Sequence, residues 1–343
     1  MTSTIPWSSA SRVAARLAGS YPLEGSYHFH HLTEQAPGLV DRAARLVEEE
    51  TGLRSQGMPE VVVVTRSEWA ERNVASFSVL LAPAEERLAA AAGDSGSGLS
   101  RRVLAAETGA LLGLLARRVL GQYELVLPTG SEADIVTLVG ANILALERTH
   151  QLDPAEFRSW LALHECTHRL QFTAVPWLRG YFRGLVNDLV ESAQPEPGRL
   201  ARVAAEVAKA LRTRQPVVDD TGLIGLFASP EQRAVLRRVQ ALMSLLEGHG
   251  HVVMDRVGGR VLQTQERMSR LLKARRSDPR LAALFRLTGL DLKMKQYELG
   301  ERFVIGVEAV AGWAALDAVW EDPASLPSLD EIEQPGQWLA RVA

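Results

Sequence analysis

The stretch LALHECTHRL, residues 161–170, places two histidines four residues apart in a mostly apolar run. Glu165 follows His164 directly, and His168 lies one helical turn further on. The preceding sequence Asp153-Pro154-Ala155-Glu156 carries an N-cap acid, a proline at the first helical position and a glutamate at the third. These signals predict a helix running from residue 153 to about 172. Because a helix advances about 100° per residue, both imidazoles lie on one face and can reach one metal ion.

The chemistry of this set favours zinc. Neutral imidazoles bind zinc at about 2.0–2.1 Å, and a neighbouring carboxylate can take a proton from a water molecule at an open coordination position. We therefore expect His164 and His168 as zinc ligands and Glu165 as general base. Cys166 lies about 200° from His164 around the helix and is expected to be a small packing residue.

Two histidines leave the coordination of zinc incomplete, so a third ligand must come from elsewhere. One known extension of the motif needs a glycine three residues and a histidine six residues after the second histidine. The sequence has Gln171 and Ala174 at these positions, which excludes that solution. Arg169, a charge directly after the second histidine, is a further departure from the usual pattern.

The remaining solution is a glutamate from a later helix, and LLEGHGHVVMD, residues 245–255, offers one. Glu247, His251 and Asp255 are spaced by four, which puts them on one helical face. Glu247 is the preferred third ligand, with His249 and His251 as alternatives. Asp255 is a candidate to orient a ligating histidine through a hydrogen bond. Gly248 and Gly250 suggest that this segment packs closely against the motif helix.

The rest of the chain predicts a mixed but mainly helical protein. Short β-branched or apolar runs predict strands at 60–65, 123–127 and 135–139, the last two joined by a turn at 128–131. Apolar periodicity predicts helices at 35–54, 67–92, 99–121, 230–259, about 263–276, 279–288 and 296–321. We expect an N-terminal α/β subdomain with edge strands over residues 1–150. A helical metal-binding subdomain is expected over 151–343, the two forming one catalytic unit.

Composition excludes several classes of function. The 343 residues are 46% hydrophobic and carry a formal net charge of −3, so no global positive field exists to gather nucleic acid or an anionic membrane surface. No run approaches the roughly 18 apolar residues of a membrane span. The single cysteine excludes an intrachain disulfide and fits a reducing compartment. We expect a cytoplasmic protein, and the sequence does not indicate its oligomeric state.

Four segments resemble a bacterial family of zincin-like, zinc-dependent metalloproteases or hydrolases. They are LALHECTHRLQF, LLEGHGHVVMD, KMKQYELGERFV at 293–304, and the closing VWEDPASLPSLDEIEQPGQWLARV. The resemblance implies a predominantly helical α+β zincin-like fold. It also implies His164, His168 and Glu247 as zinc ligands, with Glu165 as general base. The family is linked by gene context to biosynthesis of the deazaflavin coenzyme, and none of these residues predicts such a ligand.

Two functions follow from these residues. The first is a zinc hydrolase, most directly a metallopeptidase acting on a peptide or protein, with His251 and Tyr297 as candidates to stabilise the transition state. The strand at 135–139 would be the edge to which an extended peptide adds. The alternative is a catalytically silent zincin-like scaffold that binds or regulates a partner protein. The presence of Glu165 favours the enzyme.

Overall fold

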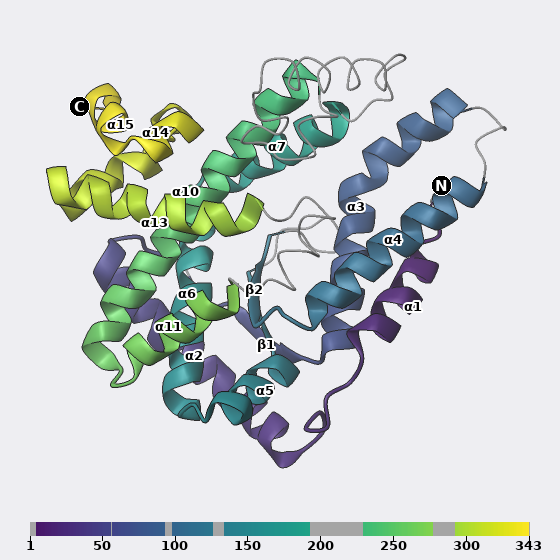
Figure 1. Cartoon of the computed structure of the whole chain (residues 1–343), viewed down its shortest axis with the longest axis horizontal. Coiled ribbons are helices and arrows are strands. Elements are labelled where there is room, and N and C mark those ends of the chain that lie inside the picture. The colour runs from purple at the N-terminus through teal and green to yellow at the C-terminus, as the bar shows by residue number, and fades with distance from the viewer. Residues whose placement is uncertain are drawn as a thin grey trace, which may run out of the picture. The chain divides into compact units, whose positions relative to one another are not determined.

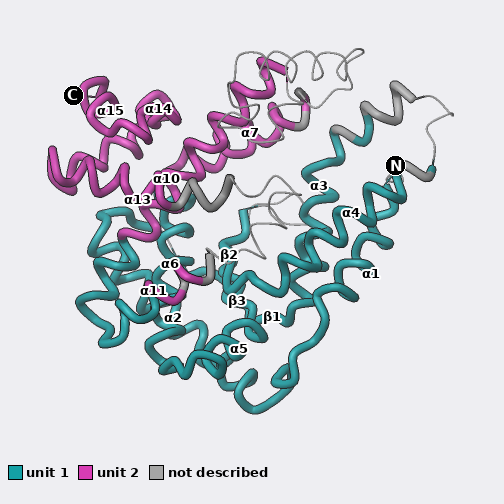
Figure 2. The backbone as a smooth tube through the Cα atoms, in the orientation of Figure 1, with its two compact units in different colours: residues 1–174, 253–268 teal, residues 175–252, 269–343 magenta. Residues whose placement is uncertain are grey.

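The structure is a computed structural model that describes residues 5–55, 57–92, 98–125, 134–192, 229–276 and 292–342. Contacts divide the chain into two compact units (Figure 2). The first contains residues 1–174 and 253–268, and the second contains residues 175–252 and 269–343. These units are defined by packing, so the predicted functional division at residue 150 stays a prediction. Each unit is described by itself below.

The first unit contains a three-stranded sheet. The strands are β1 (Glu60–Val64), β2 (Gly121–Glu124) and β3 (Ile135–Val139), in the order β1-β3-β2. β1 runs parallel to β3, and β2 runs antiparallel to it. The antiparallel pair predicted around residues 128–131 is therefore present, although its turn lies outside the described residues. The prediction that 135–139 forms an edge was wrong, because β3 bonds to a strand on each side and all its residues are buried.

Successive side chains of a strand point to opposite faces of the sheet, and different helices cover the two faces. One face packs on α1 (Trp7–Ala18), α3 (Arg66–Ala92) and α4 (Gly98–Ala116), which lie side by side in Figure 1. A hydrophobic core that includes Val64, Trp69 and Val139 fills that side. The other face meets α2 (Tyr27–Thr51) and α6 (Pro154–Ala174), with α5 (Gly140–His150) nearby. Tyr123 of β2 stacks on Phe172 of α6 on this second side.

The second unit is helical in its described residues. It comprises α7 (Leu178–Ser192), the N-terminal part of α10 (Pro230–Val261), most of α11 (Gln265–Arg276), α13 (Leu292–Ala311), α14 (Leu329–Glu333) and α15 (Pro335–Val342), with short 3-10 helices at Trp313–Trp320 and Pro323–Ser325. Its core contains Phe303, Leu316 and Trp338. The predicted helix over 296–321 is thus interrupted, because Gly312 adopts a φ of 82° and ends α13.

α10 and α13 cross at two glycines. A Cβ atom on Gly300 would lie 1.7 Å from the carbonyl oxygen of Ser244, and one on Gly248 would lie 2.1 Å from the carbonyl carbon of Gly300. Only residues without side chains allow two backbones to approach this closely. The expectation that Gly248 marks a close helix contact is correct, but its partner is α13 rather than the motif helix.

The described residues form a predominantly helical fold with one small sheet, as the sequence predicts. Several bounds differ from the prediction: α2 begins at Tyr27 rather than residue 35 and contains Pro37, and the predicted strand at 123–127 begins at Gly121. The predicted helix at 279–288 lies outside the described residues. No described helix is long and apolar enough to cross a membrane.

Candidate metal centre

The motif helix α6 begins as predicted and is tied to its surroundings at its first turn. The Asp153 carboxylate accepts a hydrogen bond from the backbone N–H of Glu156 at 3.0 Å. The Glu156 carboxylate in turn accepts the backbone N–H groups of Gln263 and Thr264, at 3.1 and 2.8 Å, in the turn between α10 and α11. These contacts fix where the helix starts, and therefore which side chains it turns inward.

His164 and His168 lie one turn apart with their rings nearly perpendicular, at 79°, and their centroids 4.5 Å apart. Their Nε2 atoms are 3.2 Å from each other. Two ligands at about 2.0 Å from one tetrahedral zinc ion would lie roughly 3.3 Å apart. The two imidazoles therefore already have the spacing that a shared metal ion requires.

Glu247 of α10 completes a group of three possible metal ligands. One ligand atom from each of His164, His168 and Glu247 lies within 4.8 Å of the other two. Glu247 is buried, with 7% of its surface exposed, and both histidines are half-buried. Two neutral nitrogen donors and one carboxylate oxygen form a donor set typical of catalytic zinc. The chemistry and spacing of these residues fit that metal.

Glu165 packs against the backbone of β2. It is buried, with 4% of its surface exposed. A Cβ atom on Gly121 would lie 2.5 Å from Glu165 Oε1 and 2.7 Å from its Cδ, so the carboxylate fits only because residue 121 has no side chain. Sequence reasoning identified Glu165 but not Gly121, because the glycine is distant in sequence and belongs to no recognised motif.

Arg169, the unusual charge after the second histidine, is a buried anchor rather than a surface residue. It is 1% exposed and forms two hydrogen bonds with the Asp134 carboxylate, at 2.7 and 2.6 Å. It also donates to Ser55 Oγ at 2.8 Å and to the carbonyl oxygen of Gly57 at 2.9 Å. Burial lowers the pKa of the Arg169 guanidinium, but the hydrogen bonds and charge of Asp134 outweigh this and raise it. The pair joins α6 to the segments that precede β1 and β3.

Cys166 points away from the motif histidines, as expected from its helical position. Its thiol donates to the carbonyl oxygen of Val40 in α2 at 3.3 Å. Burial raises the pKa of this thiol far above its ordinary value, which makes the thiolate inaccessible near neutral pH. The residue is a packing contact between α6 and α2.

Gln171 is a polar residue of this site that the sequence analysis noted only as a missing glycine. It is fully buried, and its Oε1 atom lies 2.9 Å from Nδ1 of His168. The signal that could have found it is its spacing, because a residue three positions along a helix lies on the same face as the histidine.

The remaining predicted site residues are placed as follows. His251 is 3% exposed. Asp255 accepts a hydrogen bond from Gln265 Nε2 at 2.7 Å, which joins α10 to α11. His249, an alternative ligand, stacks on Trp313 with ring centroids 5.9 Å apart and lies edge-on to Trp320 at 5.1 Å. The side chain of Tyr297 lies outside the described residues. The roles predicted for His251, Asp255 and Tyr297 stay predictions.

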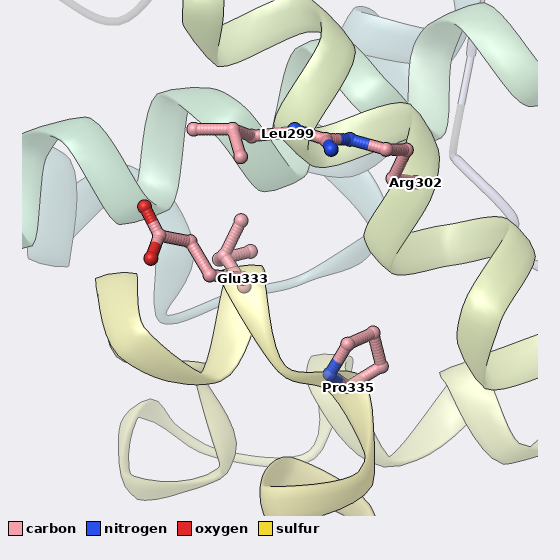
Figure 3. A pocket seen from close by; sticks show the side chains of 5 residues that line it. Leu299, Arg302, Glu333 and Pro335 are labelled. Atoms are coloured by element: carbon pink, nitrogen blue, oxygen red, sulfur yellow. The ribbon is translucent and has the colours of Figure 1, made fainter.

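A separate cavity of about 270 Å³ lies in the second unit (Figure 3). It is lined by Leu299, Arg302, Ile332, Glu333 and Pro335. None of the predicted site residues lines it, so it does not bear on the metal centre.

A helix that presents two imidazoles one turn apart, with a buried carboxylate in reach, is the arrangement on which zinc-dependent hydrolases are built. The fold and this site together define a zincin-like class of protein. Comparison with known proteins identifies the family within this class. A family described as zincin-like metallopeptidase matches residues 5–339, so the chain belongs to the zincin-like metallopeptidase family.

One solved structure is similar over almost the whole chain. It is the crystal structure of a candidate hydrolase with a novel fold from Chloroflexus aurantiacus. The two chains are 35% identical, the match covers 98% of each, and the TM-score is 0.73. No curated protein matches the chain. Neither match bears on the deazaflavin link of the family that the sequence resembles.

Proposed function

We propose that this protein is a zinc-dependent hydrolase, most directly a metallopeptidase, with His164, His168 and Glu247 holding the metal. The observation that carries the proposal is the clustering of these three side chains around the motif helix in a chain of the zincin-like metallopeptidase family. Each residue is a standard zinc ligand, and the set leaves one tetrahedral position open for water or substrate.

A zinc ion bound there supplies Lewis acidity, which polarises a carbonyl group and lowers the pKa of water to about 7. Glu165 is the group that accepts a proton from the attacking water and returns it to the leaving amine. Its low exposure limits competing water, and the absence of a side chain at Gly121 leaves room for its carboxylate. His251 and Tyr297 remain the candidates for donating a hydrogen bond to the developing oxyanion.

The sheet offers a way to hold an extended peptide. β2 is the outer strand beside β3 and carries Gly121, against which Glu165 lies. Among the described residues β2 pairs with β3 alone, and a peptide that added to its other side would pass about 4.8 Å from that strand, close to the general base. We therefore propose β2 as the docking strand, in place of β3. A cytoplasmic location remains part of this proposal and rests on the single cysteine.

The test is digestion of a diverse peptide library by the zinc-loaded protein and by its Glu165→Gln variant. The amide keeps the shape of the side chain but cannot accept the proton, so we expect cleavage by wild type alone and equal zinc content in both. Cleavage by the variant within about tenfold of wild type would assign the base elsewhere. Full zinc content with no cleavage by either protein would refute the metallopeptidase and favour a silent scaffold.

A further inference from the structure

We propose that Gln171 is a positioning residue that fixes the tautomer of His168 and thereby prepares its Nε2 atom to bind metal. The inference rests on the proposed metal centre and deepens it by naming a residue outside the ligand set. Gln171 lies on α6, three positions after His168, and its side chain has no exposed surface.

In the hydrogen bond between His168 and Gln171, the chemistry of the two groups decides which one donates. A side-chain amide oxygen only accepts hydrogen bonds, so Nδ1 of His168 must donate across the 2.9 Å contact with Gln171 Oε1. A neutral imidazole carries one proton, and with that proton on Nδ1 the lone pair lies on Nε2. Nε2 is the atom that lies 3.2 Å from Nε2 of His164. Gln171 therefore leaves unprotonated the ring nitrogen of His168 that faces His164.

The geometry also restrains the ring. A hydrogen bond at one nitrogen limits rotation about the bond that joins the imidazole to Cβ, and the full burial of Gln171 holds the acceptor side chain in place. Residues that hold a ligating histidine in this way commonly alter metal affinity by 10–100-fold when they are replaced. A carboxylate at this position would increase the basicity of the ring further, whereas the neutral amide orients the ring without adding a buried charge.

Three variants distinguish positioning of His168 by Gln171 from a simple packing role of that side chain. Gln171→Met keeps the length of the side chain and removes the strong acceptor. Gln171→Glu keeps the acceptor. Thr167→Val is the matched control, since Thr167 is also fully buried on α6 but donates its hydroxyl to the carbonyl oxygen of Leu163 at 2.8 Å, away from the imidazole.

The first measurement is the tautomer of His168 in zinc-free protein, read from ¹⁵N chemical shifts and two-bond couplings at a pH above the imidazole pKa. We expect the Nδ1–H form in wild type, Gln171→Glu and Thr167→Val, and a shift toward the Nε2–H form in Gln171→Met. An Nε2–H tautomer in wild type, or no change in Gln171→Met, would overturn the proposal.

The second measurement is zinc affinity by competition with a chelator. We expect Gln171→Met to bind zinc 10–100-fold more weakly, and Gln171→Glu and Thr167→Val to stay within about threefold of wild type or, for the glutamate, to bind more tightly. An affinity of Gln171→Met within twofold of wild type would contradict the role. If wild type binds no zinc, the proposed function fails, while the tautomer measurement in zinc-free protein still decides whether Gln171 positions His168.

Discussion

At the scale of single residues, the candidate site depends on a glycine, Gly121, as well as on its metal-binding and catalytic side chains. Gly121 belongs to no catalytic motif, yet a methyl group there would meet the carboxylate of Glu165 at 2.5 Å. The atoms it would meet form the far end of a flexible side chain, so the strain can be relieved by moving Glu165 rather than the backbone. Gly121 is therefore expected to matter for activity more than for stability.

We predict that Gly121→Ala folds and binds zinc as wild type does but loses about 100-fold in kcat/KM on a peptide found by the digestion experiment. A misplacement of about 1 Å at a reacting group can cost this much. Unfolding by urea should give a free energy within about 1 kcal/mol of wild type. The control is Gly259→Ala, whose added Cβ meets nothing within 4 Å. Activity of Gly121→Ala within threefold of wild type would show that Glu165 is not displaced.

The sequence predicted some residues of the candidate site and missed others. His164, Glu165 and His168 were found because a helical repeat places them together whatever the rest of the fold does. Glu247 was found as one candidate among three, because 79 residues separate it from His168 and helical spacing does not reach that far; the family resemblance then supported it. Gly121 was missed because its role depends on a strand packing against α6, which leaves no sequence signature. Gln171 was missed because its spacing places it on the face of His168 but does not reveal the orientation of the imidazole ring.

At the scale of elements, the crossing of α10 and α13 holds the helix that carries Glu247. Gly248 directly follows Glu247, and its partner Gly300 contacts the backbone of α10 at Ser244. Here the obstacle to an added methyl group is backbone, which cannot rotate away. The second unit therefore depends on these glycines for its stability, in contrast to Gly121.

We predict that Gly300→Ala destabilises the protein by about 2–3 kcal/mol, because a Cβ 1.7 Å from the Ser244 carbonyl oxygen forces the helices apart. Gly184→Ala in α7 is the matched control, since nothing lies within 4 Å of its added Cβ. It should stabilise by about 0.5–1 kcal/mol through helix propensity. Chemical denaturation of both variants measures the difference. Equal stability of the two would mean that the helices do not cross at Gly300.

The C-terminal helices α14 and α15 are held together by hydrogen bonds to Glu331. Its carboxylate accepts the backbone N–H of Ser328 at 2.8 Å in a capping box, and two hydrogen bonds from Arg341 at 2.6 and 3.1 Å. Burial raises the pKa of Glu331, but the hydrogen bonds from Arg341 and Ser328 outweigh this and lower it. The charged form of Glu331 is therefore favoured in the folded chain.

A lowered pKa in the folded state fixes the sign of the pH dependence. The stabilisation by Glu331 is complete above the ordinary glutamate pKa of about 4.3 and is lost as the pH falls through the lower folded value. We predict that amide exchange in residues 329–342, corrected for intrinsic rates, loses protection on acidification through this window. Glu331→Gln should be less protected at pH 7 and respond less to acid. The same acid response in variant and wild type would contradict the assignment.

The element scale is also where sequence prediction was least exact. The helices 153–172 and 230–259 were predicted closely because capping residues mark their starts. The strand at 135–139 was taken as an edge, although its five apolar or β-branched residues fit a strand bonded on both sides equally well. The order of strands depends on β1, about 70 residues earlier, and local pattern does not encode that pairing.

At the scale of the whole molecule, the motif helix is fixed by contacts that do not involve metal. Arg169 joins it to Asp134, Glu156 to the turn at Thr264, and Cys166 to Val40. These contacts all lie within the first unit and are independent of the imidazoles. Metal is therefore expected to stabilise an existing fold rather than to create it, unlike the metal of a zinc finger.

We predict that the chelator-treated protein keeps its helical circular dichroism and unfolds cooperatively, at a lower temperature than the zinc-loaded form. Binding to the folded state alone contributes about 2.7 kcal/mol when free zinc is 100 times the dissociation constant. Calorimetry at several buffered zinc concentrations measures the dependence. Loss of helical signal on chelation would show that the fold itself requires metal.

The central claim is that His164, His168 and Glu247 bind one zinc ion, and metal content tests it most directly. Wild type and the variants His164→Ala, His168→Ala and Glu247→Ala are purified, loaded with zinc, dialysed against a weak chelator and assayed by atomic emission, with Thr167→Val as the control. We predict about one zinc per chain in wild type and control, and well below half in each ligand variant, because each loses one of three protein ligands. Unchanged zinc stoichiometry in His164→Ala and His168→Ala would contradict the account.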